Sequence, residues 1–122
     1  MKKAGLCILI IVFMLSLVSC AGAAGQKNAA PGAPGGLKLV IVPNGFRLTW
    51  TPSPDDPGAV TGYEIVRADL ASGPFDSVGT VGKGVSEYVD TSALKEVIYY
   101  YKVRATAGSM YSPDSNTVTG ER

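Results

Sequence analysis

Short runs of alternating apolar and polar residues, separated by turn-forming residues, fill the chain from residue 37 onward. In residues 46–50 and 99–105 every second residue is apolar and would lie on one face of a strand. No segment of this region has the 3.6-residue period of an amphipathic helix. We therefore expect strands at residues 37–42, 46–50, 63–67, 75–81, 87–89, 99–105 and 116–119. Several short strands between turns are typical of an all-β antiparallel sandwich or barrel.

The apolar faces of these strands predict the core of the domain. Phe46, Leu48 and Trp50 share one face of their strand, and Tyr63 and Ile65 share one face of the next. Buried aromatic side chains contribute large apolar areas, so we expect Trp50 at the centre of the core.

The N-terminal segment has a different character. Two lysines near the start precede an uncharged apolar run, residues 6–18, which is typical of a secretory signal peptide. The next residues complete Leu-Val-Ser-Cys, which resembles the lipobox of bacterial lipoproteins. The resemblance implies cleavage after Ser19, lipidation of Cys20 and stable anchoring by several acyl chains. An uncleaved membrane helix over residues 4–24, or a buried helix of the domain, stays an alternative.

A tether is expected between this signal and the domain. Residues 21–36 are mostly Ala, Gly and Pro with one charge, and they lack the bulky apolar residues that a core needs. The predicted organisation is a signal peptide at 1–19, a lipidated cysteine with a flexible tether at 20–36 and a folded domain at 37–122. No Asp follows Cys20, so an exported, lipid-anchored protein of a Gram-negative source would be expected in the outer membrane.

Charge and residue types argue against several classes of function. The chain has 11 basic and 10 acidic residues, so it lacks the strong positive field of a nucleic-acid-binding protein. It has no histidine, the commonest general base and metal ligand. Both cysteines, Cys7 and Cys20, precede the domain, so we expect no disulfide within it. Asp55 and Asp56 are expected in a solvated turn. We predict no catalytic residue, no metal site and no cofactor.

The order of several motifs resembles that of fibronectin type III domains, over residues 34–122. The matching segments are Leu48-Thr49-Trp50, Gly62-Tyr63-Glu64-Ile65, Tyr88-Val89-Asp90, Tyr99-x-Tyr101-x-Val103-x-Ala105 and Ser115-Asn116-Thr117-Val118. The resemblance implies a seven-stranded, antiparallel immunoglobulin-like sandwich. One of Tyr99 and Tyr101 is expected to form a tyrosine corner, and the register favours Tyr99, whose hydroxyl would bond a backbone group in residues 94–97. One departure is that residues 95–98 stand where the family usually has Pro-Gly.

Five residues form a candidate binding patch near the C-terminal end of the domain. Tyr100, Lys102 and Arg104 alternate with the core residues of their strand and would face outward, while Met110 and Tyr111 are expected in the loop that follows. A basic strand with an aromatic residue can bind an acidic glycan or a protein, and exposed Met and Tyr are common in interfaces. A solvated sheet face is the alternative.

Together these features predict a membrane-anchored, non-catalytic binding or spacer module of the bacterial cell envelope. It would act through contacts with an unidentified envelope protein, bind no nucleic acid and have a monomeric domain. The alternative function is a carbohydrate-binding accessory lipoprotein. That function needs a platform of exposed aromatic rings, for which Tyr100 and Tyr111 are the candidates.

Overall fold

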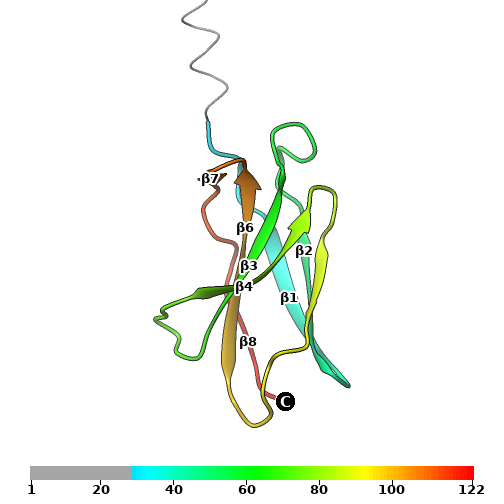
Figure 1. Ribbon diagram of the computed structural model, residues 1–122, viewed down its shortest axis with the longest axis vertical. Helices are drawn as coiled ribbons and strands as arrows, with labels where there is room; N and C mark the ends of the chain where they lie inside the picture. The colour runs from blue at the N-terminus through cyan, green and yellow to red at the C-terminus, as the bar shows by residue number, and fades with distance from the viewer. Residues whose placement is uncertain (1–28) are drawn as a thin grey trace, which may run out of the picture.

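The computed structural model describes residues 29–122, which form two antiparallel sheets packed face to face (Figure 1). The first sheet has the order β1-β2-β5 and contains β1 (Gly35–Val42), β2 (Gly45–Thr51) and β5 (Glu87–Asp90). The second has the order β4-β3-β6-β7, with β8 also paired to β6, and contains β3 (Gly62–Ala68), β4 (Asp76–Gly82), β6 (Tyr99–Ala107), β7 (Met110–Tyr111) and β8 (Val118–Gly120). The predicted all-β sandwich is confirmed. Within residues 29–122 no helix is long and apolar enough to cross a membrane.

The structure has one strand more than the seven expected, and the difference lies after β6. Met110 and Tyr111 do not lie in a loop but form the short strand β7, in which Tyr111 pairs with Thr106. The last strand is Val118–Gly120 rather than residues 116–119. The segment that links β7 to β8 is held to β6 by side chains instead of by a strand ladder. The hydroxyls of Ser112 and Ser115 accept hydrogen bonds from backbone amides of β6.

Asn116 explains why β8 begins later than expected. Its side-chain oxygen accepts a hydrogen bond from the amide of Leu37 at 2.8 Å, and its side-chain nitrogen donates to the carbonyl of Leu37 at 3.0 Å. The amide group of Asn116 thus imitates a backbone unit and pairs with β1, in the other sheet. This contact closes the sandwich along one side.

The described residues before the predicted domain start at residue 37 also pack on the sandwich. Strand β1 begins at Gly35, and Pro31 and Pro34 are buried. The amide of Gly32 donates a hydrogen bond to Asp55 at 2.7 Å. Proline loses little conformational entropy when it is buried, which lets a segment without bulky residues pack on the sandwich. The remainder of the tether, the predicted signal peptide and Cys20 lie outside the described residues.

The turn between β1 and β2 is short. Pro43 and Asn44 form it, and Gly45 already pairs with Val42 as the first residue of β2. Glycine is required there by a close approach, because a Cβ atom at Gly45 would overlap the carbonyl oxygen of Asp90 in β5.

The core lies between the sheets, as the alternation predicts. Its fully or nearly buried members are Leu37, Phe46, Leu48, Trp50, Val60, Tyr63, Ile65, Ala93, Tyr99, Tyr101, Val103 and Ala105. The rings of Trp50 and Tyr63 lie 5.7 Å apart, so Trp50 of β2 packs in the core against β3 of the other sheet. The tyrosine corner is confirmed as well, since the Leu94 amide donates a hydrogen bond to the Tyr99 hydroxyl at 3.2 Å.

Candidate functional site

The predicted binding patch lies on the outer face of the larger sheet. Strand pairing places Tyr100, Lys102 and Arg104 of β6 opposite Ala68, Val66 and Glu64 of β3. The three β6 residues are half-exposed, whereas the alternate residues of β6 are buried in the core. The structure therefore places these three side chains on the face that the sequence predicts.

Arg104 already has partners within the molecule. Its Nε atom donates a hydrogen bond to Glu64 at 2.7 Å, and its Nη2 atom forms an ion pair with the same carboxylate oxygen at 2.5 Å. The guanidinium carbon lies 3.8 Å from the ring centroid of Tyr111. Tyr111 reaches this position because it pairs with Thr106 on the same face. The patch thus brings Arg104 and Tyr111 together, with the charge of Arg104 matched by Glu64.

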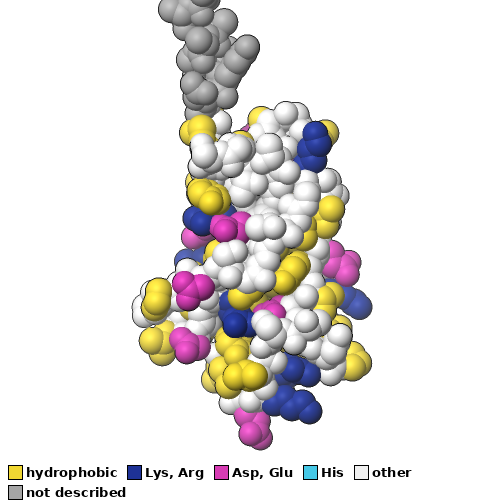
Figure 2. Space-filling view, in the orientation of Figure 1, with side chains coloured by type: hydrophobic (Ala, Val, Ile, Leu, Met, Phe, Trp, Pro, Cys, Tyr) yellow, Lys and Arg dark blue, Asp and Glu magenta, His cyan; other side chains and the backbone are white. Residues whose placement is uncertain are grey.

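Lys102 is also partnered, by a second set of neighbours. Its ammonium lies 4.3 Å from the ring centroid of Phe75 and 3.7 Å from a carboxylate oxygen of Asp114. Figure 2 shows acidic and basic side chains intermingled over this part of the surface rather than a field of one sign. Two matched cations do not make a strong site for an acidic glycan.

The two exposed tyrosines do not form one platform. Tyr100 pairs with Thr119 and Tyr111 with Thr106, so the two rings belong to positions six residues apart along β6. At about 3.3 Å per residue this separation is about 20 Å. Met110 lies beside Tyr111 in β7, opposite Ala107, and is half-exposed. The patch is therefore a cluster of Arg104, Met110 and Tyr111 at one end of β6, with Tyr100 at the other.

A buried polar cluster, which the sequence analysis missed, lies at the opposite end of the sheets. Asp90 of β5 is 1% exposed and accepts four hydrogen bonds. Its donors are the Tyr101 hydroxyl at 2.6 Å, Arg67 Nη1 at 2.9 Å, and the amide and hydroxyl of Ser92 at 2.9 and 2.7 Å. The cluster joins β5 of one sheet to β3 and β6 of the other.

The hydrogen bonds of this cluster set the charge state of its members. Burial favours the neutral form of Asp90, but hydrogen bonds from Ser92, Tyr101 and Arg67 outweigh it and hold the pKa of this carboxyl below its usual range. Burial and the hydrogen bond to Asp90 raise the pKa of Tyr101. At neutral pH the cluster is an ion pair of Arg67 and Asp90 with a neutral tyrosine.

A signal for the cluster was present in the sequence. The alternation that puts Tyr63 and Ile65 inward continues to Arg67, which the strand pairing places opposite the buried Tyr101. An arginine directed inward needs a carboxylate, because an unpaired buried charge is costly. Asp90, the last residue of β5, is that carboxylate.

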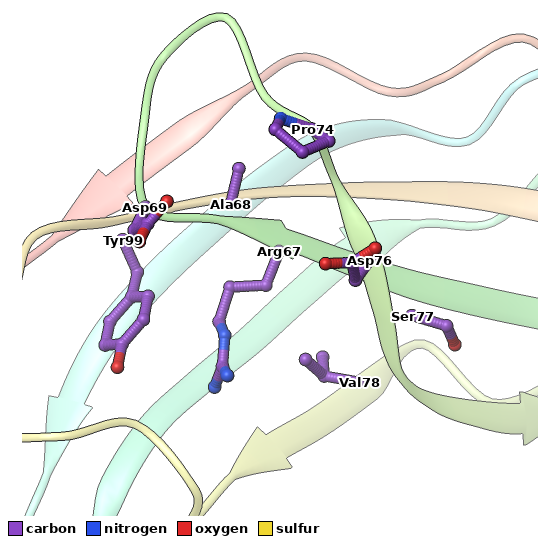
Figure 3. Close-up of a pocket in the computed structure, with 8 residues that line it drawn as sticks. All are labelled: Arg67, Ala68, Asp69, Pro74, Asp76, Ser77, Val78 and Tyr99. Carbon is purple, nitrogen blue, oxygen red and sulfur yellow. The ribbon is translucent and has the colours of Figure 1, made fainter.

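A hollow of about 340 Å³ lies beside this cluster (Figure 3). Its lining residues are Arg67, Ala68, Asp69, Pro74, Asp76, Ser77, Val78 and Tyr99. In Figure 3 the Arg67 side chain lies between Tyr99 on one side and Asp76 and Val78 on the other. The guanidinium carbon of Arg67 is 4.5 Å from the ring centroid of Tyr99, so the side chain is held by this ring as well as by its ion pair with Asp90.

Asp55 and Asp56 lie in a turn, with Asp55 exposed and Asp56 half-exposed, and both accept hydrogen bonds there. Asp56 accepts hydrogen bonds from the Tyr63 hydroxyl at 2.7 Å and from the Gly84 amide at 2.9 Å, while Asp55 binds Gly32 as described above. The hydrogen bond from Tyr63 lowers the pKa of Asp56. Burial, together with this bond, raises the pKa of Tyr63 to about 12. Residues 29–122 contain no group of three His, Cys, Asp or Glu that would hold a metal ion.

Comparison with solved structures identifies the architecture. A fibronectin type III-like protein from Clostridium thermocellum superposes with a TM-score of 0.64 and 27% sequence identity, over 75% of this chain and 92% of that protein. The fold is a fibronectin type III-like sandwich. No protein-family model matches the sequence.

Comparison with characterised proteins finds segments similar to this chain inside long enzymes. A stretch of 71 residues, 58% of this chain, is 45% identical to part of the amylopullulanase of Thermoanaerobacter thermohydrosulfuricus. A stretch of 72 residues is 44% identical to part of the amylopullulanase of Thermoanaerobacterium saccharolyticum. In both cases the match spans only 5% of the length of the enzyme.

Proposed function

We propose that this chain is a non-catalytic accessory module of the bacterial cell envelope, which is exported and anchored through lipid on Cys20. The observation that carries the proposal is the likeness of its sandwich to a segment that makes up 5% of each amylopullulanase. A segment that small within a long enzyme is typical of an appended module rather than of a whole catalytic domain. The lipobox-like residues before Cys20 supply the anchor.

The contacts of its polar residues support a role without catalysis. A general acid or base must be within hydrogen-bond reach of a substrate. Asp90 instead accepts four hydrogen bonds from its own chain, and Asp56 accepts two. These carboxylates hold loops and strands together.

The cluster of Arg104, Met110 and Tyr111 is the surface we assign to a protein partner. Tyr111 is 47% exposed, and its ring is held in place by Arg104. Tyrosine, arginine and methionine are enriched in protein interfaces, and a ring that is already ordered loses less entropy on binding. The cluster lies on β6 and β7, near the end of the sandwich where the first described residues lie (Figure 1).

A carbohydrate-binding accessory role is the second candidate, and the likeness to amylopullulanases favours it. The exposed tyrosines do not provide the site, because Tyr100 and Tyr111 are about 20 Å apart along β6. A glycan would need a different surface of the sandwich.

Metabolic labelling with a palmitate analogue tests the anchor. We expect label on the wild-type chain and on Cys7→Ala, the matched control, and none on Cys20→Ala, which should also stay unprocessed after Ser19. Equal labelling of Cys20→Ala and the wild type would contradict the proposal. A photoreactive residue at position 111 should then give a crosslinked protein in cells, whereas one at the exposed Val85 should not.

A further inference from the structure

The hollow beside Arg67 has the features of a ligand site that the predicted patch lacks. Its volume of about 340 Å³ is at the small end of the range for pockets that bind small molecules. Its lining comes from β3, β4, the segment between them and the start of β6, and it combines charged, hydroxyl and apolar side chains. The hollow lies against the larger sheet, at the start of β6, whereas the cluster of Arg104, Met110 and Tyr111 lies at the other end of β6.

Arg67 offers fixed hydrogen-bond donors to this hollow. Its Nη1 atom is used by Asp90 and Ser92, while its Nε and Nη2 atoms donate to no acceptor within residues 29–122. The side chain is 22% exposed and stacked on Tyr99, so its position is set before any ligand arrives. A donor that is already held loses little entropy on binding. Because Asp90 matches its charge, Arg67 acts towards the hollow chiefly as a donor.

Two carboxylates and a hydroxyl supply acceptors around the same hollow. Asp76 pairs with Arg67 across β3 and β4, so both side chains lie on the same face of the sheet. Asp76 nevertheless forms no ion pair with any described residue, because Arg67 is directed to Asp90 instead. Asp69 is likewise without an ion pair in the described part of the chain, and Ser77 adds a hydroxyl. Figure 3 shows Asp76 beside Arg67, on the side away from Tyr99.

The combination of donors and acceptors selects the class of ligand. An acidic ligand would be repelled by Asp69 and Asp76, whose charges no described cation matches. A calcium ion needs six to eight oxygen ligands, and residues 29–122 contain no group of three candidate ligands. Neighbouring hydroxyl groups on a sugar ring can donate hydrogen bonds to Asp76 and accept hydrogen bonds from Arg67. The apolar atoms of Pro74 and Val78 can contact the C–H groups of the same ring. We propose that this hollow binds a neutral saccharide, through one end of the glycan chain.

This inference rests on the second candidate function, carbohydrate binding, and not on the lipid anchor. The probe is maltotriose, with trigalacturonate as the acidic comparison, and binding is measured by saturation-transfer NMR on the full chain in detergent micelles. The variants are Asp76→Ala and, as matched control, Asp114→Ala, an exposed aspartate outside the hollow. Asp76 has no ion pair to lose, so its replacement should leave folding intact, which the unfolding midpoint checks.

We expect maltotriose to bind the wild type and Asp114→Ala equally, and trigalacturonate to bind neither. A hydrogen bond to a charged group is worth about tenfold or more in affinity, so Asp76→Ala should bind maltotriose at least about tenfold more weakly. If Asp76→Ala bound maltotriose as tightly as the wild type does, the hollow would not be the site, although the protein would still be a carbohydrate-binding one. Absence of maltotriose binding to the wild type would overturn both. Displacement of maltotriose by lysine amide would identify a cation site and overturn the proposal.

Discussion

Arg67 and Arg104 lie in two different regions of the molecule and have the same kinds of partner, a tyrosine ring and a carboxylate. Each guanidinium is stacked on a tyrosine ring, at 4.5 Å from Tyr99 and 3.8 Å from Tyr111, and each is paired with a carboxylate. The carboxylate partner of Arg67, Asp90, is 1% exposed, whereas the side chain of Glu64, the carboxylate partner of Arg104, is 14% exposed and the tyrosine stacked on Arg104 is 47% exposed. The groups are alike, and their access to water differs.

The comparison shows that burial, rather than the kind of contact, decides what such a cluster does. In the buried cluster Asp90 has four donors, because a carboxylate out of water must be satisfied by its own protein. On the outer face water reaches the half-exposed Arg104 and can replace a missing partner, so its ion pair with Glu64 should contribute about 1 kcal/mol or less. The first arrangement holds the two sheets together, and the second leaves side chains available for binding.

Replacement of Asp90 should have the largest effect. Asp90→Ala leaves the charge of Arg67 and the hydroxyl of Tyr101 without their acceptor at the end of the core. Breaking a buried ion pair from one side costs about 3–5 kcal/mol, so we expect a loss of free energy of unfolding of about that size. Urea unfolding followed by the fluorescence of Trp50, the single tryptophan, measures it. Glu64→Ala is the control, and an equal loss there would remove the distinction between the two clusters.

The next largest difference in stability between the two clusters should come from removing a single tyrosine hydroxyl in each. Tyr101→Phe deletes the 2.6 Å hydrogen bond to buried Asp90 and should cost about 1.5–3 kcal/mol, the range for a hydrogen bond to a charged group. Tyr111→Phe keeps the ring that Arg104 contacts and should be nearly neutral. Both variants keep the volume of the ring, so the difference in unfolding midpoint reports the hydroxyl alone. Similar losses in both would show that Tyr111 is not the more exposed residue in solution.

The buried cluster should also give stability a dependence on pH. The pKa of Asp90 is lower in the folded chain, so its contribution is present above the unfolded value of about 3.9 and is lost as pH falls through the folded pKa. The pKa values of Tyr63 and Tyr101 are raised, so their contribution is present below about 10 and is lost at higher pH.

Unfolding midpoints measured across pH test this dependence. We expect a plateau near neutral pH with losses on both sides, and a weaker loss on the acid side in Asp90→Asn, which has no carboxyl to titrate. The same acid loss in Asp90→Asn and the wild type would assign the dependence to other groups, of which Asp56 is the first to replace, since its pKa is also lowered.

The alternation of apolar and polar residues along each strand predicted most of the fold. It could not predict the contacts between segments that are distant in the sequence. The buried face of β2 followed directly from Phe46, Leu48 and Trp50, because side chains alternate along any strand. The late start of β8 depends on Asn116 meeting Leu37, 79 residues away, and no local pattern contains that distance. The same holds for Asp90, whose role appears only when Arg67 is brought to it by the packing of the sheets.

The candidate patch was predicted in part for the same reason. The outward direction of Lys102 and Arg104 follows from the period of β6, and the structure confirms it. Their neutralisation by Asp114 and Glu64 does not, because both partners lie on other segments of the chain. Met110 and Tyr111 were expected in a loop, and their pairing with β6 depends on a turn at Gly108, which has a positive φ of 63°.

The smallest effect should come from the outer cluster, and it should respond to salt. Arg104→Ala removes a stack on the exposed Tyr111 and a partly buried ion pair with Glu64, so we expect a loss of free energy of unfolding of about 1 kcal/mol at low ionic strength. In about 1 M salt, where the Debye length is about 3 Å, the ionic part of this loss should disappear. The loss in Asp90→Ala should persist, because salt does not reach a buried pair. Urea unfolding of both variants at two salt concentrations measures the contrast, and a salt-independent cost above about 2 kcal/mol for Arg104→Ala would mean that this arginine holds the sheet together rather than serving a partner.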